Sequence, residues 1–108
     1  MIDRDRMTSK LLSLDSAAAL VPDGAQVVMS AGMERAPMAL LRALARRRAK
    51  GLRALGVVGG AINMDFLCGA RALASIDTCS VSMNPYHRDA PNFVRAIQTG
   101  QIRMFDNT

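Results

Sequence analysis

The chain has few aromatic side chains: of its 108 residues none is tryptophan, one is tyrosine and three are phenylalanine. Modules that hold single-stranded nucleic acid stack the bases on aromatic rings, so the composition disfavours nucleic acid as a partner. Half of the residues are nevertheless hydrophobic and eight are methionine. The core is therefore predicted to be aliphatic.

Cysteine and histidine are also scarce, with Cys68, Cys79 and His87 as the complete set. No CxxC spacing and no histidine cluster is present, so the sequence predicts neither a metal site nor a redox pair. We expect both thiols to be buried and reduced. The sequence alone establishes no Ser/His/Asp order, and His87 is predicted to lie in a surface loop.

No run approaches the 18 or so apolar residues that a membrane span needs, and residues 1–6 are mostly charged where a signal peptide would turn apolar. We therefore expect a cytoplasmic protein that does not contact a membrane. The length predicts one domain, residues 1–108, with a modest core. Because the core is modest, stability is expected to depend on a partner.

The net charge of +5 is concentrated in one stretch, residues 34–53. Its apolar positions fall on one face of a predicted helix, and its cations gather toward the C-terminal end, where they complement the helix dipole. Two interpretations remain: a solvated helix face, or a surface that holds an anionic partner. The basic residues of the stretch are Arg35, Arg42, Arg46, Arg47, Arg48, Lys50 and Arg53.

Helical and strand patterns alternate along the chain, which predicts the α/β class with a mostly parallel sheet and right-handed crossovers. Ser13 is expected to cap the first helix, Pro37 to open the basic helix and Gly51 to close it. Helices are predicted within residues 10–21, from 37 to 50, from about 63 to 70 and over 92–99, and strands over 25–30, 52–58, 76–83 and 102–106.

Ligands of parallel α/β sheets bind beyond the carboxyl ends of the strands. The segments that follow the first three predicted strands form the candidate site, and they contain Gly32, Met33, Glu34, Arg35, Gly59, Gly60 and Asn84. Each has a functional and a structural interpretation.

The pair Gly59 and Gly60 allows either the close approach of an anion to a helix N-terminus or a tight turn without ligand. It matches no nucleotide-binding motif. Glu34 is an acid, base or nucleophile in one interpretation and a local ion pair of Arg35 in the other. Asn63 and Asn84 either donate to a carbonyl or cap local turns.

Taken in order, residues 10–24, 30–44, 52–60, 66–69 and 92–104 resemble the A (alpha) subunit of the family I coenzyme A transferases, in the branch of the glutaconate CoA-transferases. The resemblance implies a three-layer fold with a Rossmann-like sheet. It also implies that CoA moves between an acyl-CoA and a carboxylic acid through a glutamyl-CoA thioester. CoA is then a substrate, and no cofactor is bound permanently.

In that family the catalytic glutamate belongs to the B (beta) subunit, in a motif that this chain lacks. Glu34 does not match it, so no catalytic residue is assigned here. The resemblance implies that Gly32 to Arg35, Gly59, Gly60 and the stretch near Asn84 form walls of the substrate pocket. The implied partners are a B subunit, acyl-CoA and a carboxylic acid, in an oligomer.

Two departures from the family pattern stand out. Ser30 occupies the place of the first of two glycines, and the chain ends at Thr108 where family A subunits continue. We therefore expect an N-terminal portion of an A subunit with an exposed sheet edge and uncovered apolar faces. The alternatives are a CoA-thioester hydrolase subunit of the same fold and a small basic α/β module without catalytic activity.

Overall fold

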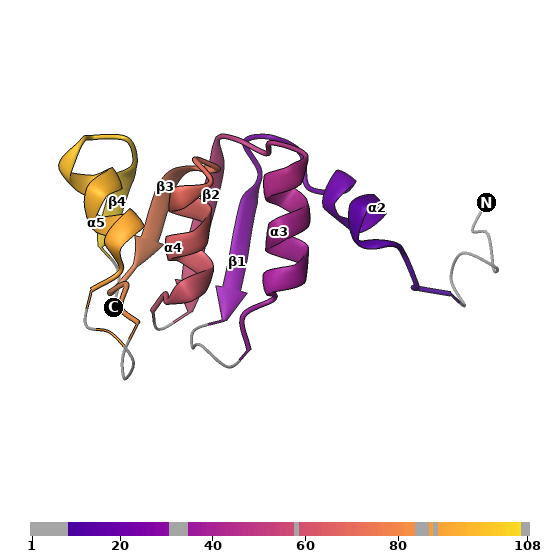
Figure 1. Ribbon diagram of the computed structural model, residues 1–108, viewed down its shortest axis with the longest axis horizontal. Coiled ribbons are helices and arrows are strands. Elements are labelled where there is room, and N and C mark those ends of the chain that lie inside the picture. Colours follow the sequence, from indigo (N-terminus) through magenta and orange to yellow (C-terminus); the bar gives the residue numbers. More distant parts are fainter. Residues whose placement is uncertain (1–8, 31–34, 58, 84–86, 88, 107–108) are drawn as a thin grey trace.

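The computed structural model describes residues 9–30, 35–57, 59–83, 87 and 89–106 (Figure 1). Its centre is a sheet of four parallel strands in the order β1-β2-β3-β4. The strands are β1 (Gln26–Ser30), β2 (Leu52–Val57), β3 (Leu73–Thr78) and β4 (Arg103–Asp106). The α/β class and the parallel sheet are thus confirmed.

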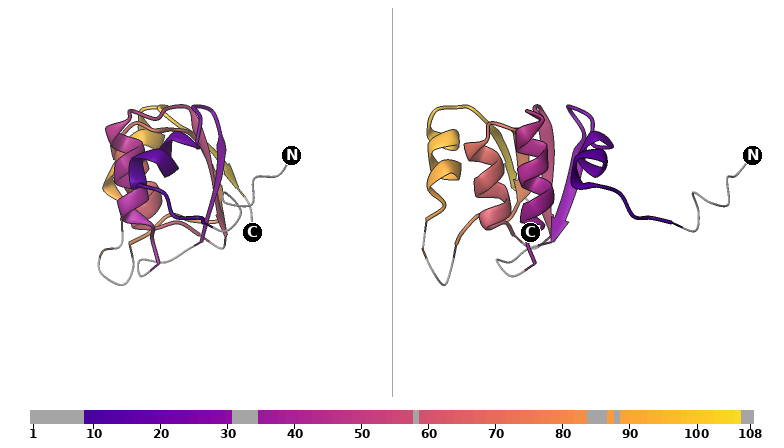
Figure 2. Two further views of the ribbon diagram at one scale, coloured as in Figure 1. Left: turned by 90° about the vertical axis from the view of Figure 1, so that its right-hand side faces the viewer. Right: turned by 45° about the vertical axis from the view of Figure 1, so that its right-hand side comes forward.

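Three helices connect the strands, and a fourth precedes them. α3 (Met38–Arg46), α4 (Ile62–Gly69) and α5 (Pro91–Gln98) are the crossovers, and α2 (Leu14–Ala19) packs beside α3. Each crossover moves one strand in the same direction, so right-handed connections place all three helices on one face of the sheet. Figure 2 shows this arrangement edge-on. The described residues therefore form two layers, and the third layer of the expected fold is not among them.

The core between the helices and the sheet is aliphatic, as predicted. Its largest buried side chains come from α3, β2, α4 and β3 in turn, and are Leu41, Leu44, Leu52, Met64, Leu67 and Ile76. Each contributes about 1.5–3 kcal/mol by leaving water. These side chains form the core that holds the helices against the strands.

All three crossover helices end in the same hydrogen-bonded motif. After α3, the Arg48 N–H donates to the carbonyl of Ala45 and the Ala49 N–H to that of Leu44. The residue in the left-handed region is Arg48 (φ 58°) after α3, Arg71 (φ 56°) after α4 and Gly100 (φ 71°) after α5. This is the Schellman arrangement, which normally uses glycine. The prediction that Gly51 closes the basic helix is wrong, because that helix already ends at Arg46.

Other boundaries follow the sequence more closely. Ser13 caps α2 as expected, its Oγ accepting from the Ser16 N–H at 3.1 Å. Pro37 is the cap residue of α3 rather than its first turn.

The third strand lies earlier than expected, at Leu73–Thr78 instead of residues 76–83. The segment after it keeps one isolated parallel bridge to the turn that follows β2, between Gly60 and Val81. In this bridge the Gly60 N–H donates to the Ser80 carbonyl, and the Ser82 N–H to the Gly60 carbonyl.

Candidate functional site

The carboxyl ends of the four strands lie at one edge of the sheet, the lower edge in Figure 1. Of the predicted site residues, Gly59 and Gly60 follow β2 at this edge, and Arg35 is exposed in the segment that leads into α3. Gly32, Met33, Glu34 and Asn84 lie outside the described residues. The arrangement of Glu34 and Asn84 about the edge therefore stays a prediction.

The turn after β2 needs glycine at position 60, where a side chain would overlap Met64, while position 59 is in ordinary contact with its neighbours. A Cβ on Gly60 would lie 2.4 Å from the Met64 Sδ. A Cβ on Gly59 would lie 3.4 Å from the Ser80 carbonyl oxygen and 3.5 Å from its Oγ. Gly59 and Gly60 thus form a tight turn, locked to the segment that follows β3.

The first turn of α4 is capped from within. The Asn63 Oδ1 accepts from the Ala61 N–H at 3.0 Å and from the Met64 N–H at 2.8 Å. Asn63 is fully buried, and these bonds confirm that its side-chain oxygen caps the helix start. Two of the N–H groups at this helix start are therefore already bonded.

Behind the turn, the edge is closed by Met64 and Thr78. A Cβ on Gly56 would lie 2.6 Å from the Met64 Cε, 2.8 Å from the Thr78 Oγ1 and 2.9 Å from the Gly59 carbonyl oxygen. The Thr78 hydroxyl is buried and makes no hydrogen bond within the described residues. The space below the strand-end edge is therefore filled by packed side chains.

The two cysteines differ in environment, which corrects one of the two predictions. Cys68 is buried in α4, and this burial, with the charge of Asp65 as the second cause, raises the pKa of its thiol to about 12. Cys79 is exposed directly after β3. Its Sγ lies 3.8 Å from the Ser80 Oγ and 4.0 Å from the Cβ position of Gly59. Both cysteines are outside any disulfide.

Cys79 is thus a candidate site residue that the sequence analysis missed. The sequence analysis extended the third strand to residue 83. A strand that ends at Thr78 would have placed Cys79 next to the carboxyl edge of the sheet.

His87 belongs to a local turn, as expected of a surface histidine. Its Nδ1 lies 2.7 Å from the Asp89 carbonyl oxygen, and its backbone N–H donates to the Met83 carbonyl. The Asp89 N–H also donates to the same Nδ1, at 3.2 Å. The ring is therefore used to hold the turn that precedes α5.

The basic stretch is partly structural. The Arg47 guanidinium donates to the carbonyls of Ala18 and Val21 and lies 3.3 Å from the Asp23 carboxylate. It ties α2 and the following turn to α3.

The other arginines of the stretch lie on the surface. Arg46 forms an exposed ion pair with Asp15 at 3.4 Å. Arg42 and Arg48 are exposed, and in the part of the chain that the structure describes they form no ion pair. The solvated-face interpretation fits Arg42 and Arg48, and Arg47 acts as an internal anchor.

Two classes of site find no support among the described residues. No group of three His, Cys, Asp or Glu side chains lies close enough there to hold a metal ion. Nor does any helix among them have the length and apolarity to cross a bilayer.

Comparisons with known proteins identify the fold. No family profile matches the chain, and no curated protein matches it in sequence. Among solved structures, the decarboxylase AibA/AibB, in a cysteine-to-serine variant, is similar with a TM-score of 0.74 and 25% identity. The match covers 90% of this chain and 38% of that chain, so this chain spans well under half of its neighbour's length. The fold is CoA-transferase-like, which confirms the coarse part of the resemblance.

Proposed function

We propose that the chain is the N-terminal portion of an A subunit of a CoA-transferase, and that its strand-end edge forms part of an acyl-CoA pocket. The observation that carries this proposal is the likeness to an enzyme of CoA-transferase-like fold over 90% of the chain. The glycine turn after β2 and the exposed Arg35 lie at the edge where α/β sheets bind ligands. Both features suit a bulky anionic thioester.

The proposed reaction divides the work between two chains. A carboxylate of the partner B subunit attacks the acyl-CoA thioester carbonyl, forms an acyl–glutamyl anhydride and releases the CoA thiolate. The thiolate then attacks the glutamyl carbonyl, which forms the enzyme–CoA thioester and releases the first acid. The second acid takes CoA by the reverse of these steps.

In this proposal the present chain binds and orients, and it carries no nucleophile. Arg35 attracts the negative charge of CoA. Gly59 and Gly60 form the close-packed backbone turn at the base of the pocket, held by the Ser80 carbonyl. Gly32, Met33, Glu34 and Asn84 complete the pocket walls. CoA is a substrate, and no permanent cofactor is required.

Decarboxylation is a second candidate reaction, because the solved neighbour is a decarboxylase. Hydrolysis of the CoA thioester is a third candidate reaction. In it, water instead of the second acid attacks the glutamyl-CoA thioester and releases CoA. The three reactions share the pocket and differ in product, which allows one assay to distinguish them.

The test is co-expression of the full chain with a CoA-transferase B subunit, followed by light scattering and by acyl-CoA exchange with an isotope-labelled acid. We expect a complex that forms labelled acyl-CoA; carbon dioxide or free acid alone would identify the second or third reaction. Arg35→Glu should raise the KM for acyl-CoA at least tenfold, and Arg42→Glu, on the outer face of α3, should not. The proposal would be refuted by a stable monomer that neither binds the B subunit nor exchanges acyl-CoA in its presence.

A further inference from the structure

A cavity of about 290 Å³ lies between α2 and α3, in the helical layer of the molecule. Charged side chains form part of its wall, those of Asp15, Arg46 and Arg47. The buried residues Ala18 and Ala43 complete the lining. Ligand pockets in proteins measure about 300–1,000 Å³. The cavity therefore suits a small ligand, with methyl groups on its inner side and charged groups around it.

The two guanidinium groups of the cavity both have donors left for a ligand. Arg47 donates to two backbone carbonyls and to the Asp23 carboxylate, which holds its side chain in place. Arg46 lies 3.4 Å from one Asp15 oxygen and makes no other hydrogen bond within the described residues. A guanidinium carries five N–H groups. Neither arginine is therefore saturated by the contacts it makes.

The carboxylate that faces Arg46 holds it only weakly. The Asp15 side chain is 84% exposed and that of Arg46 is 59% exposed. An exposed ion pair contributes little, because water screens both charges. The separation of 3.4 Å is also long, since a charge-assisted hydrogen bond usually measures about 2.7–2.9 Å. An anion with more charge than Asp15 can therefore displace it from Arg46.

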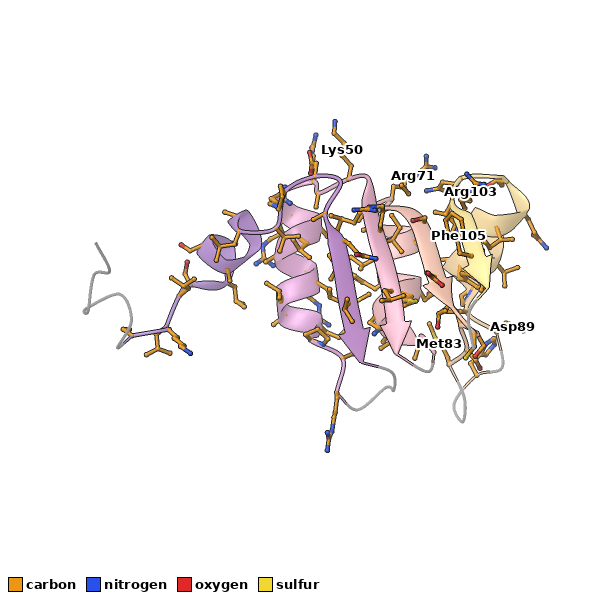
Figure 3. The ribbon with its side chains drawn as sticks, turned by 180° about the vertical axis from the view of Figure 1, so that it is seen from behind. Lys50, Arg71, Met83, Asp89, Arg103 and Phe105 are labelled. Carbon is orange, nitrogen blue, oxygen red and sulfur yellow. The ribbon has the colours of Figure 1, made fainter. Side chains whose placement is uncertain are left out.

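The surroundings of the cavity attract anions. Arg42 on α3, and Arg48 and Lys50 in the segment after it, are further exposed cations. Figure 3 shows Lys50 beyond the end of α3. The nearby carboxylate of Asp23 is already bonded to Arg47 and to the Lys50 N–H. Positive charge therefore exceeds negative charge here, which raises the local concentration of anions.

A phosphate monoester matches this set of groups better than a carboxylate does. It carries about two negative charges at neutral pH and has three strong acceptor oxygens, so it can accept from both guanidinium groups at once. Arginine pairs with phosphate through two parallel hydrogen bonds. The methyl groups of Ala18 and Ala43 provide an apolar surface for a small substituent on the phosphate.

We propose that the cavity between α2 and α3 binds a small phosphate monoester. Arg46 and Arg47 hold the phosphate group, and Ala18 and Ala43 contact its substituent. Binding displaces Asp15 from Arg46. The cavity lies toward the amino ends of the strands, because α3 ends shortly before β2 begins. The site is therefore separate from the strand-end edge, and the proposal is independent of the reaction proposed above.

The test is a titration of the ¹⁵N-labelled full chain with phenyl phosphate, followed through the amide resonances at constant ionic strength. We expect saturable shifts confined to α2, the second half of α3 and the segments next to them. Inorganic phosphate should shift the same amides, because it carries the same group. Phenylacetate keeps the ring but has a single charge, and it should bind at least fivefold more weakly than phenyl phosphate.

Two variants and a matched control locate the site. Arg46→Gln should weaken the binding of phenyl phosphate at least fivefold. Arg71→Gln removes the same charge from another exposed arginine, which Figure 3 shows far along the sheet from α2, and should change the affinity less than twofold. Asp15→Asn removes the competing carboxylate and should strengthen binding at least twofold. Circular dichroism verifies that each variant is folded.

Several results would overturn the proposal. Shifts that do not saturate, or that spread over basic residues of the whole chain, would show only a general attraction of anions to a basic protein. Equal losses of affinity in Arg46→Gln and Arg71→Gln would have the same meaning. Unchanged or weaker binding in Asp15→Asn, or equal affinity for phenylacetate and phenyl phosphate, would also contradict it.

Discussion

Asp65 connects two helices that are far apart in sequence, and its replacement offers a sharp test of the packing. Its Oδ1 accepts from the Phe93 N–H and its Oδ2 from the Asn92 Nδ2, both at 2.9 Å. Phe93 is the third residue of α5, whose own cap residue, Ala90, makes no side-chain cap bond. The buried carboxylate on α4 therefore caps α5 from outside, where a negative charge also suits the helix dipole.

The cost of Asp65→Ala follows from these two bonds. Loss of a helix cap costs about 1 kcal/mol, and loss of a hydrogen bond to a charged acceptor costs about 1.5–3 kcal/mol. We expect unfolding to become easier by about 3 kcal/mol, which lowers Tm by roughly 10–20 °C in a domain of this size. Asp65→Asn should cost only about 1 kcal/mol, because its oxygen still accepts from Phe93 and a rotated Asn92 amide offers it an oxygen.

Urea unfolding followed by far-UV circular dichroism measures these differences, and hydrogen exchange at the Phe93 amide gives a local readout. Asp15→Ala is the matched control, because its ion pair with Arg46 is exposed and should contribute under about 1 kcal/mol. The reasoning fails if Asp65→Ala costs no more than Asp15→Ala, or if the alanine and asparagine variants at position 65 are equally unstable.

Three further predictions concern single residues. Iodoacetamide at pH 8 should modify the exposed Cys79 in the native chain and Cys68 only in urea, because burial raises the pKa of Cys68 to about 12; peptide mapping that finds equal rates would contradict this. Arg48→Gly should raise the free energy of unfolding by about 0.5–1 kcal/mol, since φ is 58° there, and a loss of stability in urea melts would count against it. The hydrogen bond from the Lys50 N–H, aided by Arg47, lowers the pKa of Asp23 below 3.8. The stability that Asp23 provides is thus present above that pH and lost as pH falls through its folded pKa, so the urea midpoint of Asp23→Asn should fall less on acidification than that of the wild type.

Local sequence rules predicted the features that depend on near neighbours. The alternation of strand and helix gave the α/β class, and Ser13 capped its helix as expected. The third strand was misplaced because residues 76–83 alternate in polarity. The true strand, Leu73–Thr78, contains an irregularity where its pairing with β2 shifts between Leu52 and Arg53. That shift breaks the period-two burial pattern on which strand prediction relies.

The features missed by the sequence analysis depend on contacts across the fold. Asp65 and Asn92 are 27 residues apart, and nothing in the local pattern of either predicts that one caps the helix of the other. Arg48 and Arg71 adopt a backbone conformation that favours glycine, so helix ends inferred from glycine alone were misjudged for α3. Gly59 and Gly60 of the predicted site follow β2 at the carboxyl edge of the sheet, and Cys79 was missed because its strand was extended too far.

The open face of the sheet, which no helix covers in the described part of the chain, and the strand-end edge are joined through β3. Asp77 points to the open face, and the next residue, Thr78, packs against the Cβ position of Gly56 on the opposite side of the sheet. Two residues later, the Ser80 carbonyl accepts from the Gly60 N–H. The same stretch of chain therefore carries a residue of the open face and the carbonyl that holds the glycine turn. A change of packing at Thr78 is thus expected to shift that turn, because Thr78 and Ser80 are only two residues apart.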